Sequence, residues 1–408
     1  MGESAYVRNP AAIPGAKKPS SINLRFDVPL LISVVCLIII GLLMVYSASM
    51  EISLRGEKSA SYMLQRQVMW ALLGLGVALA ISQVNYHHLI RFALPLMGIT
   101  LFLLFVVLWV NDGSSPNRTL LGGSVQPSEL AKIVIIIYLS VWLNSKKDQI
   151  TSISFGLVPM VTILGLTAGL ILLEPDISAA GTVIIIGMLL FIISGGELRQ
   201  LLLVVPAALI AGGFVVLISS TGQQRLGDYF AGLRDPIDAS YHVQRAMEAV
   251  ARGGLFGVGL GKGLTKFTGL PVPWTDSIFA VIAEETGILG AGVVVALFVI
   301  VLWRGFSIAR KAPDFFGALL ASGMTTWLLV EAIINIGVMV NLVPFAGNAL
   351  PFVSFGGSNL VTSLVGVGIM MSVSRQGEEE SQVGRRTFSA VINLRGRNGR
   401  RSVPRHGR

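Results

Sequence analysis

The sequence predicts an all-α polytopic membrane protein with about ten transmembrane helices, and three observations favour this fold class. Of the 408 residues, 53% are hydrophobic and only 13% are charged, whereas an average soluble protein carries roughly 25% charged residues. Ten apolar runs come close to the length that crosses a hydrocarbon core of about 30 Å. A long polar stretch, residues 220–275, separates the seventh run from the eighth. This composition excludes a single soluble domain, a disordered chain and a disulfide scaffold.

The first apolar run, residues 29–49, follows a polar N-terminal tail at residues 1–28. The run is too long, and starts too far into the chain, for a cleaved signal peptide, so it predicts a transmembrane helix. Nine further helices are predicted at 67–84, 89–110, 126–143, 153–173, 178–195, 200–219, 276–303, 315–340 and 354–374. Residues 29–375 therefore form one transmembrane domain. An even number of crossings places both termini on the same side of the membrane.

Lysine and arginine orient these helices. Short segments on the side of the two termini contain 20 of the 31 basic residues, and short loops on the other side contain four. Positive charge in short loops favours the cytoplasmic side, whereas long loops count little. We therefore expect a multi-pass protein of the inner membrane with both termini in the cytoplasm and an extracytoplasmic 220–275 loop. The net charge of +9 then reports topology and requires no nucleic-acid partner.

The long loop and the C-terminal tail have different patterns. Residues 241–251 predict an amphipathic helix. Its apolar face consists of Tyr241, Val243, Met247 and Val250. A glycine-dense stretch follows at 253–263, and glycine allows positive φ and close backbone approach. The tail, residues 376–408, starts acidic and becomes rich in arginine, and its low apolar content predicts a disordered cytoplasmic segment.

Ionisable side chains within apolar runs are costly and mark functional positions. Glu129 and Lys132 are three residues apart at the start of the fourth run, so they share a helix face and can pair. Two interpretations are equally supported: an ion pair that holds helices together, or the charged wall of an outward cavity. Glu174 and Asp176 end the fifth run. For these residues a helix break with solvated carboxylates is favoured over a pair of acids at the mouth of the same cavity.

Asp276 lies where the long loop re-enters the membrane. Thr275 or Asp276 would make a good helix N-cap, and a carboxylate at the membrane surface could equally act as a general base. Glu284 and Glu285 follow on the same helix, about 12 Å deeper at helical rise. Their helical angles differ from that of Asp276, so we expect polar residues of the bundle interior rather than a catalytic dyad.

Glu331 and Asn335, one turn apart in the ninth run, favour interhelical hydrogen bonds. From these residues alone the chain is a ten-helix membrane protein with an outward polar cavity beside a glycine-rich loop. Transport, enzymology on a lipid substrate and scaffolding all remain open.

Six strings in this order resemble the SEDS family (shape, elongation, division and sporulation), the peptidoglycan glycosyltransferases that include RodA and FtsW. They are GLLMVYSAS at 41–49, QPSELAK at 126–132, RGGLFGVG at 252–259, TDSIFA at 275–280 with EE at 284–285, INIG at 334–337, and LPFVSFGGS at 350–358. The VYSAS string and the long basic tail are more similar to the FtsW branch than to RodA.

The resemblance implies polymerisation of lipid II on the outer face of the cytoplasmic membrane during cell division or elongation. The 4-hydroxyl of GlcNAc on the acceptor attacks the anomeric carbon of MurNAc on the lipid-linked donor. Undecaprenyl pyrophosphate leaves, and the anomeric centre inverts. Asp276 matches the essential aspartate of the family and is implied to be the general base.

The resemblance also implies substrate contacts and partners. The candidate substrate-binding residues are Lys132, Glu129, Arg66, Arg245, Lys262 and Ser358. Their cationic groups are suited to pyrophosphate oxygens, and Glu129 would orient Lys132. A divalent cation, Mg²⁺ or Mn²⁺, is compatible with the pyrophosphate, although the sequence defines no ligand set for one. The expected partners are lipid II, membrane lipids, a class B penicillin-binding protein that crosslinks the strands, and other division or elongation proteins.

The chain departs from the family pattern near these motifs. Trp274 and Ser277 stand where the family usually has His and Phe, and Glu331 stands where it usually has Gln. Two other classes are alternatives: a transporter that flips lipid II, and a catalytically idle division scaffold. A transporter should often show inverted repeats and interrupted midplane helices, and neither is evident in the sequence. The retained Asp276 argues against an idle scaffold.

Overall fold

The computed structural model describes residues 27–55, 59, 61–110, 126–174 and 176–397, and the regular structure within these ranges is helical. Nine helices in these ranges are long and apolar enough to cross a membrane. They are α1 (Val28–Arg55), α2 (Tyr62–Gln83), α3 (His88–Val110), α4 (Pro127–Ser145), α5 (Val158–Leu173) with its preceding π-helical turn η2 (Ile153–Leu157), α7 (Leu198–Ile218), α10 (Ile278–Arg310), α11 (Phe315–Met339) and α12 (Gly357–Arg397). A shorter apolar helix, α6 (Ile177–Ile193), is the tenth. The predicted fold class is confirmed.

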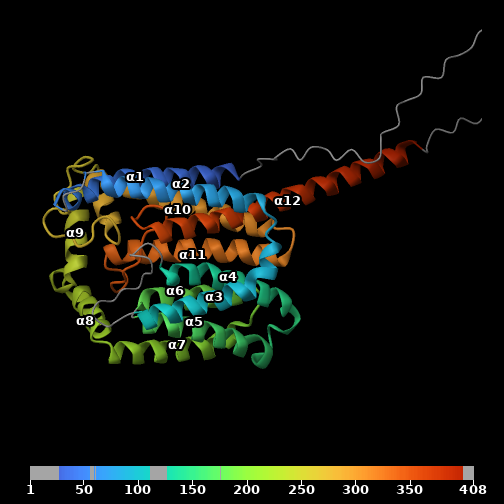
Figure 1. Cartoon of the computed structure of the whole chain (residues 1–408), viewed down its shortest axis with the longest axis horizontal. Coiled ribbons are helices and arrows are strands. Elements are labelled where there is room, and N and C mark those ends of the chain that lie inside the picture. Colours follow the sequence, from blue (N-terminus) through green and yellow to red (C-terminus); the bar gives the residue numbers. More distant parts are fainter. Residues whose placement is uncertain (1–26, 56–58, 60, 111–125, 175, 398–408) are drawn as a thin grey trace, which may run out of the picture.

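The ten helices run side by side, and two shorter helices, α8 (Ser220–Arg234) and α9 (Tyr241–Gly253), cross one end of the bundle, here called the loop end (Figure 1). Among the membrane helices, α4, α11 and α12 bury most of their surface and α7 buries the least. Helix α11 packs against α4, α6, α10 and α12, so it forms the centre of the bundle. Its Trp327 is fully buried. The exposed apolar side chains of α3 and α7 suit contact with lipid.

The first and last membrane helices have their terminal ends together, opposite the loop end. Arg304, near the end of α10, donates from Nε to Asp27 Oδ1 at 2.9 Å, immediately before α1. Gly377 in α12 packs against the backbone of Lys311, which follows α10. Helices α1 and α12 are thereby fixed to the same end of α10, as the even number of crossings requires.

The 220–275 segment contains more helix than predicted. Residues expected to be loop form α8 (Ser220–Arg234), because Ser219 caps its N-terminus and accepts from Gly222 N at 3.2 Å. A 3₁₀ turn, η3 (Pro236–Asp238), leads into α9 (Tyr241–Gly253), which confirms the predicted amphipathic helix. The predicted face is wrong at Tyr241, which is exposed. The buried residues of α9 are Val243, Ala246, Ala249 and Gly253, and these small side chains let α9 pack against α10.

Helix α10 is interrupted at Gly287, whose backbone (φ 71°, ψ −176°) is not helical. The carbonyls of Glu284 and Glu285, just before the break, accept from amides of the glycine-rich loop, and two amides just after it donate to loop carbonyls. The four bonds are Val258 N to Glu284 O (3.0 Å), Gly259 N to Glu285 O (3.0 Å), Ile288 N to Gly254 O (2.9 Å) and Leu289 N to Leu255 O (3.2 Å). The loop therefore supplies the backbone partners that the helix loses at the break.

The last helix corrects the prediction for the tail. Helix α12 continues to Arg397, whereas we expected the helix to end at residue 374 and the chain to be disordered from 376. Glutamate, glutamine and arginine have high helix propensity, and no proline occurs between 376 and 397. Low apolar content therefore does not exclude a helix. Residues 1–26 and 398–408 lie outside the described residues.

Candidate active site

A polar cavity of about 370 Å³ lies at the loop end of the bundle. It is formed by the first turns of α4, α6 and α12, by the outer part of α11, and by the segments at 275–276 and 347–349. The charged residues among its described lining are Glu129, Lys132, Asp176, Asp276 and Glu331. The fold thus brings together ionisable side chains from four different parts of the sequence.

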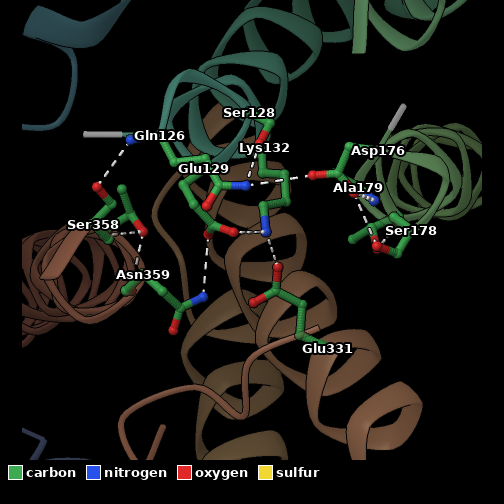
Figure 2. Close-up of polar contacts among 12 residues, drawn as sticks. Gln126, Ser128, Glu129, Lys132, Asp176, Ser178, Ala179, Glu331, Ser358 and Asn359 are labelled. Carbon is green, nitrogen blue, oxygen red and sulfur yellow. Dashed lines mark hydrogen bonds and ion pairs between the residues drawn. The ribbon is translucent and has the colours of Figure 1, made fainter. Parts of the chain in front are cut away.

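The Glu129–Lys132 pair of α4 connects three helices at this cavity. Lys132 Nζ donates to Glu129 Oε1 at 2.8 Å and also to Glu331 on α11. Glu129 Oε2 accepts from Asn359 Nδ2 on α12 at 3.1 Å. Figure 2 shows these side chains converging from α4, α11 and α12. The pair therefore joins helices, as the first interpretation expected, and it also lines a polar cavity.

Asp176 forms the neighbouring wall of the cavity. It caps α6 by accepting from Ala179 N at 3.1 Å, and its Oδ2 accepts from Gln126 Nε2 at 3.4 Å. Gln126 N donates to Ser358 Oγ at 3.1 Å, so Ser358, a predicted substrate-binding residue, also lines the cavity (Figure 2). The predicted helix break before α6 is confirmed. The expected solvation is wrong, because the packed helices bury both Glu174 and Asp176.

Asp276 lies at the edge of the cavity, two residues before α10. Asn335 Nδ2 on α11 donates to Asp276 O at 2.9 Å, and Ser354 Oγ donates to Thr275 O at 2.7 Å. Asn335 therefore bonds the segment before α10 rather than another helix, whereas Glu331, which bonds Lys132 on α4, has the interhelical role expected of both residues. The N-cap expected of Thr275 or Asp276 is wrong, because α10 starts one residue later and Ser277 occupies the cap position. The backbone that carries the Asp276 carboxylate is held from two sides.

Glu284 and Glu285 do not line this cavity; they bind the glycine-rich loop instead. Glu284 Oε1 accepts from Leu264 N at 3.0 Å and from Thr265 Oγ1 at 2.8 Å. Glu285 Oε1 lies 2.5 Å from Lys266 Nζ, and both side chains are buried. As expected, these glutamates belong to the bundle interior and form no dyad with Asp276. Our sequence reasoning missed Lys266, although a buried glutamate in an apolar helix signals that a cation must lie nearby.

Three predicted substrate-binding cations are not among the residues that line the cavity. Arg66 lies over the ring of Tyr62, with 5.9 Å between its guanidinium carbon and the ring centroid. Arg245 pairs with Glu248 at 2.6 Å along α9. Lys262 is exposed in the glycine-rich loop. Arg66 on α2, Arg245 on α9 and Lys262 in the glycine-rich loop therefore do not join Lys132 in the cavity lining.

His242 on α9 is an uncharged neighbour of the segment that carries Asp276. Ser277 Oγ donates to Pro271 O at 2.9 Å, so it accepts from His242 Nε2, which lies 2.5 Å away. Burial, reinforced by the positive charge of Arg225, lowers the pKa of His242 from 6.5 to about 4. The imidazole is therefore neutral near pH 7 and links α9 to the start of α10.

Among the described residues, no group of three or more His, Cys, Asp or Glu side chains is arranged to hold a metal ion. A cation in the cavity would need further ligands from a substrate or from water. Mg²⁺ sites are commonly completed in this way, with one or two carboxylates and substrate phosphates. The side chains present fit such a shared site better than an all-protein metal centre.

The bundle and its cavity define a class: a multi-pass membrane protein with a polar, ionisable site at one end of its membrane helices. The family model of FtsW, RodA and SpoVE, described as cell cycle protein, matches residues 28–379. The chain belongs to this family. The resemblance stated from the sequence strings is thereby confirmed.

Relatives and solved structures agree with this assignment. The probable peptidoglycan glycosyltransferase FtsW of Trichlorobacter lovleyi is 35% identical over 355 residues, which cover 86% of this chain and 93% of the relative. Stage V sporulation protein E of Bacillus subtilis is 35% identical, covering 86% of this chain and 97% of the relative.

Among solved structures, a chain of a peptidoglycan synthase complex that coordinates polymerization and crosslinking aligns with a TM-score of 0.70 at 25% identity, covering 87% of this chain and 99% of that chain. The rod shape determining protein RodA of Thermus thermophilus aligns with a TM-score of 0.62 at 25% identity, covering 86% of this chain and 97% of that one.

Proposed function

We propose that this chain is a peptidoglycan glycosyltransferase that polymerises lipid II in the cavity beside Asp276. The names of its relatives support the activity. The bias of lysine and arginine toward the end opposite the loop end supports cytoplasmic termini and a cavity on the outer face of the bacterial cytoplasmic membrane. The loop end is where lipid-linked sugars on that face would meet the protein.

One observation carries the proposed mechanism: the Asp276 carboxylate borders a polar cavity, and its backbone is fixed by Asn335 and Ser354. Asp276 accepts the proton of the GlcNAc 4-hydroxyl as that oxygen attacks the anomeric carbon of MurNAc. The bond from this carbon to the pyrophosphate oxygen breaks, and its electron pair leaves with undecaprenyl pyrophosphate. Attack opposite the leaving group inverts the anomeric centre. A positioned general base typically contributes about 10²–10⁴-fold to the rate.

The other cavity residues position the substrate. Lys132 places an ammonium group beside the leaving pyrophosphate while Glu129 fixes its direction. The Ser358 hydroxyl, which already accepts from Gln126 N, can donate to a phosphate or sugar oxygen. Arg66, Arg245 and Lys262 remain candidates only for parts of the substrate that extend beyond the cavity.

The prenyl chain of the lipid-linked substrate would bind in an apolar groove of the bundle. An apolar groove of about 350 Å³ lies between α2, α3, α4 and α12. Helix α4 contributes Glu129 and Lys132 to the polar cavity and Leu130 and Ile133 to this groove. A lipid headgroup in the cavity would therefore have apolar protein surface beside it along the same helix.

The partner in this proposal is a class B penicillin-binding protein, which crosslinks the strands that the chain polymerises. The similarity to a chain of a complex that coordinates polymerization and crosslinking supports it. Other division or elongation proteins would assemble around this pair.

The test is polymerisation of fluorescent lipid II by purified protein with and without the penicillin-binding protein, with glycan strand length read on a gel. Asp276→Asn should reduce polymerisation by about 10²-fold or more, while Asp238→Asn, on the exposed η3 turn, should leave it unchanged. Wild-type turnover in the Asp276 variant would overturn the general-base assignment. Transport of lipid II across vesicles without any polymer, from folded protein with its partner, would favour the flippase alternative.

A further inference from the structure

A second polar cavity, of about 400 Å³, lies at the end of the bundle opposite the loop end, beside the stretch of α12 at which that helix leaves the bundle (Figure 1). It lies between the C-terminal end of α10, α12 and the residue that precedes α1. Its polar side chains are those of Asp27, Arg304, Ser307, Lys311, Ser374 and Glu378. They are remote from the cavity beside Asp276, so the proposed glycosyltransferase activity does not explain them.

The donors of this cavity are suited to an anion. Arg304 uses its Nε and Nη2 atoms to bind Asp27, and its remaining N–H groups stay available. Within the part of the chain that the structure describes, Lys311 forms no ion pair, and the hydroxyls of Ser307 and Ser374 form no hydrogen bond. An ammonium group, the edge of a guanidinium group and two hydroxyls are together the donors that a phosphate group accepts from.

The charges of the cavity restrict which phosphate compound fits. The lining has two cationic and two carboxylate side chains, so its formal charge is balanced. A phosphate monoester carries close to two negative charges at pH 7, and the carboxylates would repel it at short range. A phosphodiester carries one. A ligand with one phosphodiester and one ammonium group therefore matches the lining best.

The two carboxylates differ in their availability to such a ligand. Asp27 is buried, and it accepts from Arg304 Nε at 2.9 Å and from Leu30 N at 3.2 Å. Glu378 is exposed, and a carboxylate has lone pairs for several donors at once. An incoming ammonium group would therefore bind at Glu378.

The cavity lies at the level of lipid headgroups, because its residues stand at the ends of three candidate membrane spans. These spans are Val28–Met50, Ile278–Arg310 and Gly357–Glu378. Trp303 is 59% exposed, and its ring centroid lies 5.5 Å from the guanidinium carbon of Arg304. Tryptophan is enriched at membrane–water interfaces. Val28 and Ile32 of α1 are also exposed, so acyl chains below a headgroup in the cavity would have apolar protein surface beside them.

We infer that this cavity binds the headgroup of a zwitterionic phospholipid of the ethanolamine type, from the membrane leaflet opposite the loop end. The phosphodiester accepts from Lys311 and from the hydroxyls of Ser307 and Ser374, and the ammonium group of ethanolamine binds Glu378. In the orientation proposed above, this is the cytoplasmic leaflet, where pockets with basic side chains between membrane helices bind lipid headgroups. The lipid then joins α10 to α12.

The test is native mass spectrometry of the full chain in detergent, titrated with phosphatidylethanolamine or with phosphatidylglycerol, which lacks the ammonium group. The wild type should bind phosphatidylethanolamine about fivefold more tightly than phosphatidylglycerol. Lys311→Gln should weaken the binding of both lipids by about fivefold. Arg310→Gln is the matched control, because this neighbouring arginine is exposed and is not part of the cavity lining. It should bind both lipids as the wild type does.

Glu378→Gln should abolish the preference for phosphatidylethanolamine, so that both lipids bind equally. Equal weakening in Lys311→Gln and Arg310→Gln would overturn the inference, since the lipid would then respond only to positive charge near the membrane. A wild type without a preference between the two lipids would overturn the assignment of the ethanolamine group. Displacement of the lipid by an excess of inorganic phosphate would show a site for free phosphate instead. Every readout is lipid binding, so the outcome is independent of polymerisation.

Discussion

Lys266 Nζ lies 2.5 Å from Glu285 Oε1, and both side chains are buried at the point where the glycine-rich loop enters the interrupted α10. Ser47 of α1 donates to the same Glu285 oxygen at 2.6 Å. Glu285 of α10 therefore bonds both α1, through Ser47, and the loop, through Lys266. The loop is held in place by charge as well as by its backbone bonds.

Lys266→Met should destabilise the protein by about 3–5 kcal/mol, because it leaves the Glu285 carboxylate buried without its cation. The double variant Lys266→Met/Glu285→Gln should recover part of this loss, since no uncompensated charge remains. Thermal unfolding in detergent measures both variants. Equal losses in the single and double variants would show that the ion pair does not stabilise the loop.

Gly287→Ala should destabilise the fold by about 1–3 kcal/mol through its backbone conformation alone. A Cβ at this position would also lie 2.4 Å from Gly257 N and from Leu255 O, so the loop would have to move. Gly292→Ala on the same helix meets open space and should be neutral or stabilising by up to about 1 kcal/mol. A comparison of the unfolding midpoints of the two variants tests whether the packing of the glycine-rich loop against the break in α10 stabilises the fold. Equal midpoints would contradict this.

Lys132→Met should cost about 3–5 kcal/mol of stability, because Glu129 and Glu331 then face each other without a cation. Adding Glu331→Gln should restore a measurable part of that stability. Polymerisation should stay low in both variants, since both lack the ammonium group beside the leaving pyrophosphate. Unfolding midpoints and lipid II turnover, measured on the same preparations, separate the two roles. Full activity in the restored double variant would confine Lys132 to a structural role.

Stability should fall as the pH is lowered through the range in which His242 differs between the folded and unfolded states. Its pKa is about 4 in the folded protein against an ordinary value of 6.5. The unfolded chain therefore binds more protons between these values, so the stabilisation is complete above pH 6.5 and is lost toward pH 4. His242→Gln should show a smaller decrease of the unfolding midpoint between pH 7 and about pH 4.5. Parallel pH profiles for the two proteins would refute this expectation.

The sequence predicted the membrane helices well, because apolar length is a local property. It also predicted α9, where a polar loop contains apolar residues at helical spacing. It failed for α8, where Leu226, Tyr229, Phe230 and Leu233 recur at the i, i+3, i+4, i+7 spacing of a helix, a signal that we did not use. It also failed for residues 376–397, whose helix propensity we did not weigh. Low hydrophobicity excludes a packed core but leaves helix formation open.

The sequence allowed us to predict individual residues of the candidate site, but not which of them share one cavity. Helical spacing placed Glu129 and Lys132 on one face, and the position of Asp276 at the membrane surface marked it as a candidate base. Arg66, Arg245 and Lys262 were equally plausible cations by charge, yet they are not in the cavity lining. Residue type indicates what a side chain can bind, whereas helix packing decides which side chains share a cavity.

The sequence by itself determined the number and order of the membrane crossings, the distribution of positive charge and the polar residues of each helix. Only the tertiary structure decided which charges meet. Glu331 contacts Lys132 across 199 residues of sequence, and Glu285 contacts Lys266 across 19 residues and a change of direction. Periodicity fixes the face of a helix on which a residue lies, but the partner of that face depends on how the helices pack together. That packing gives the cavity its excess of carboxylates and gives α10 the loop that completes its backbone hydrogen bonds.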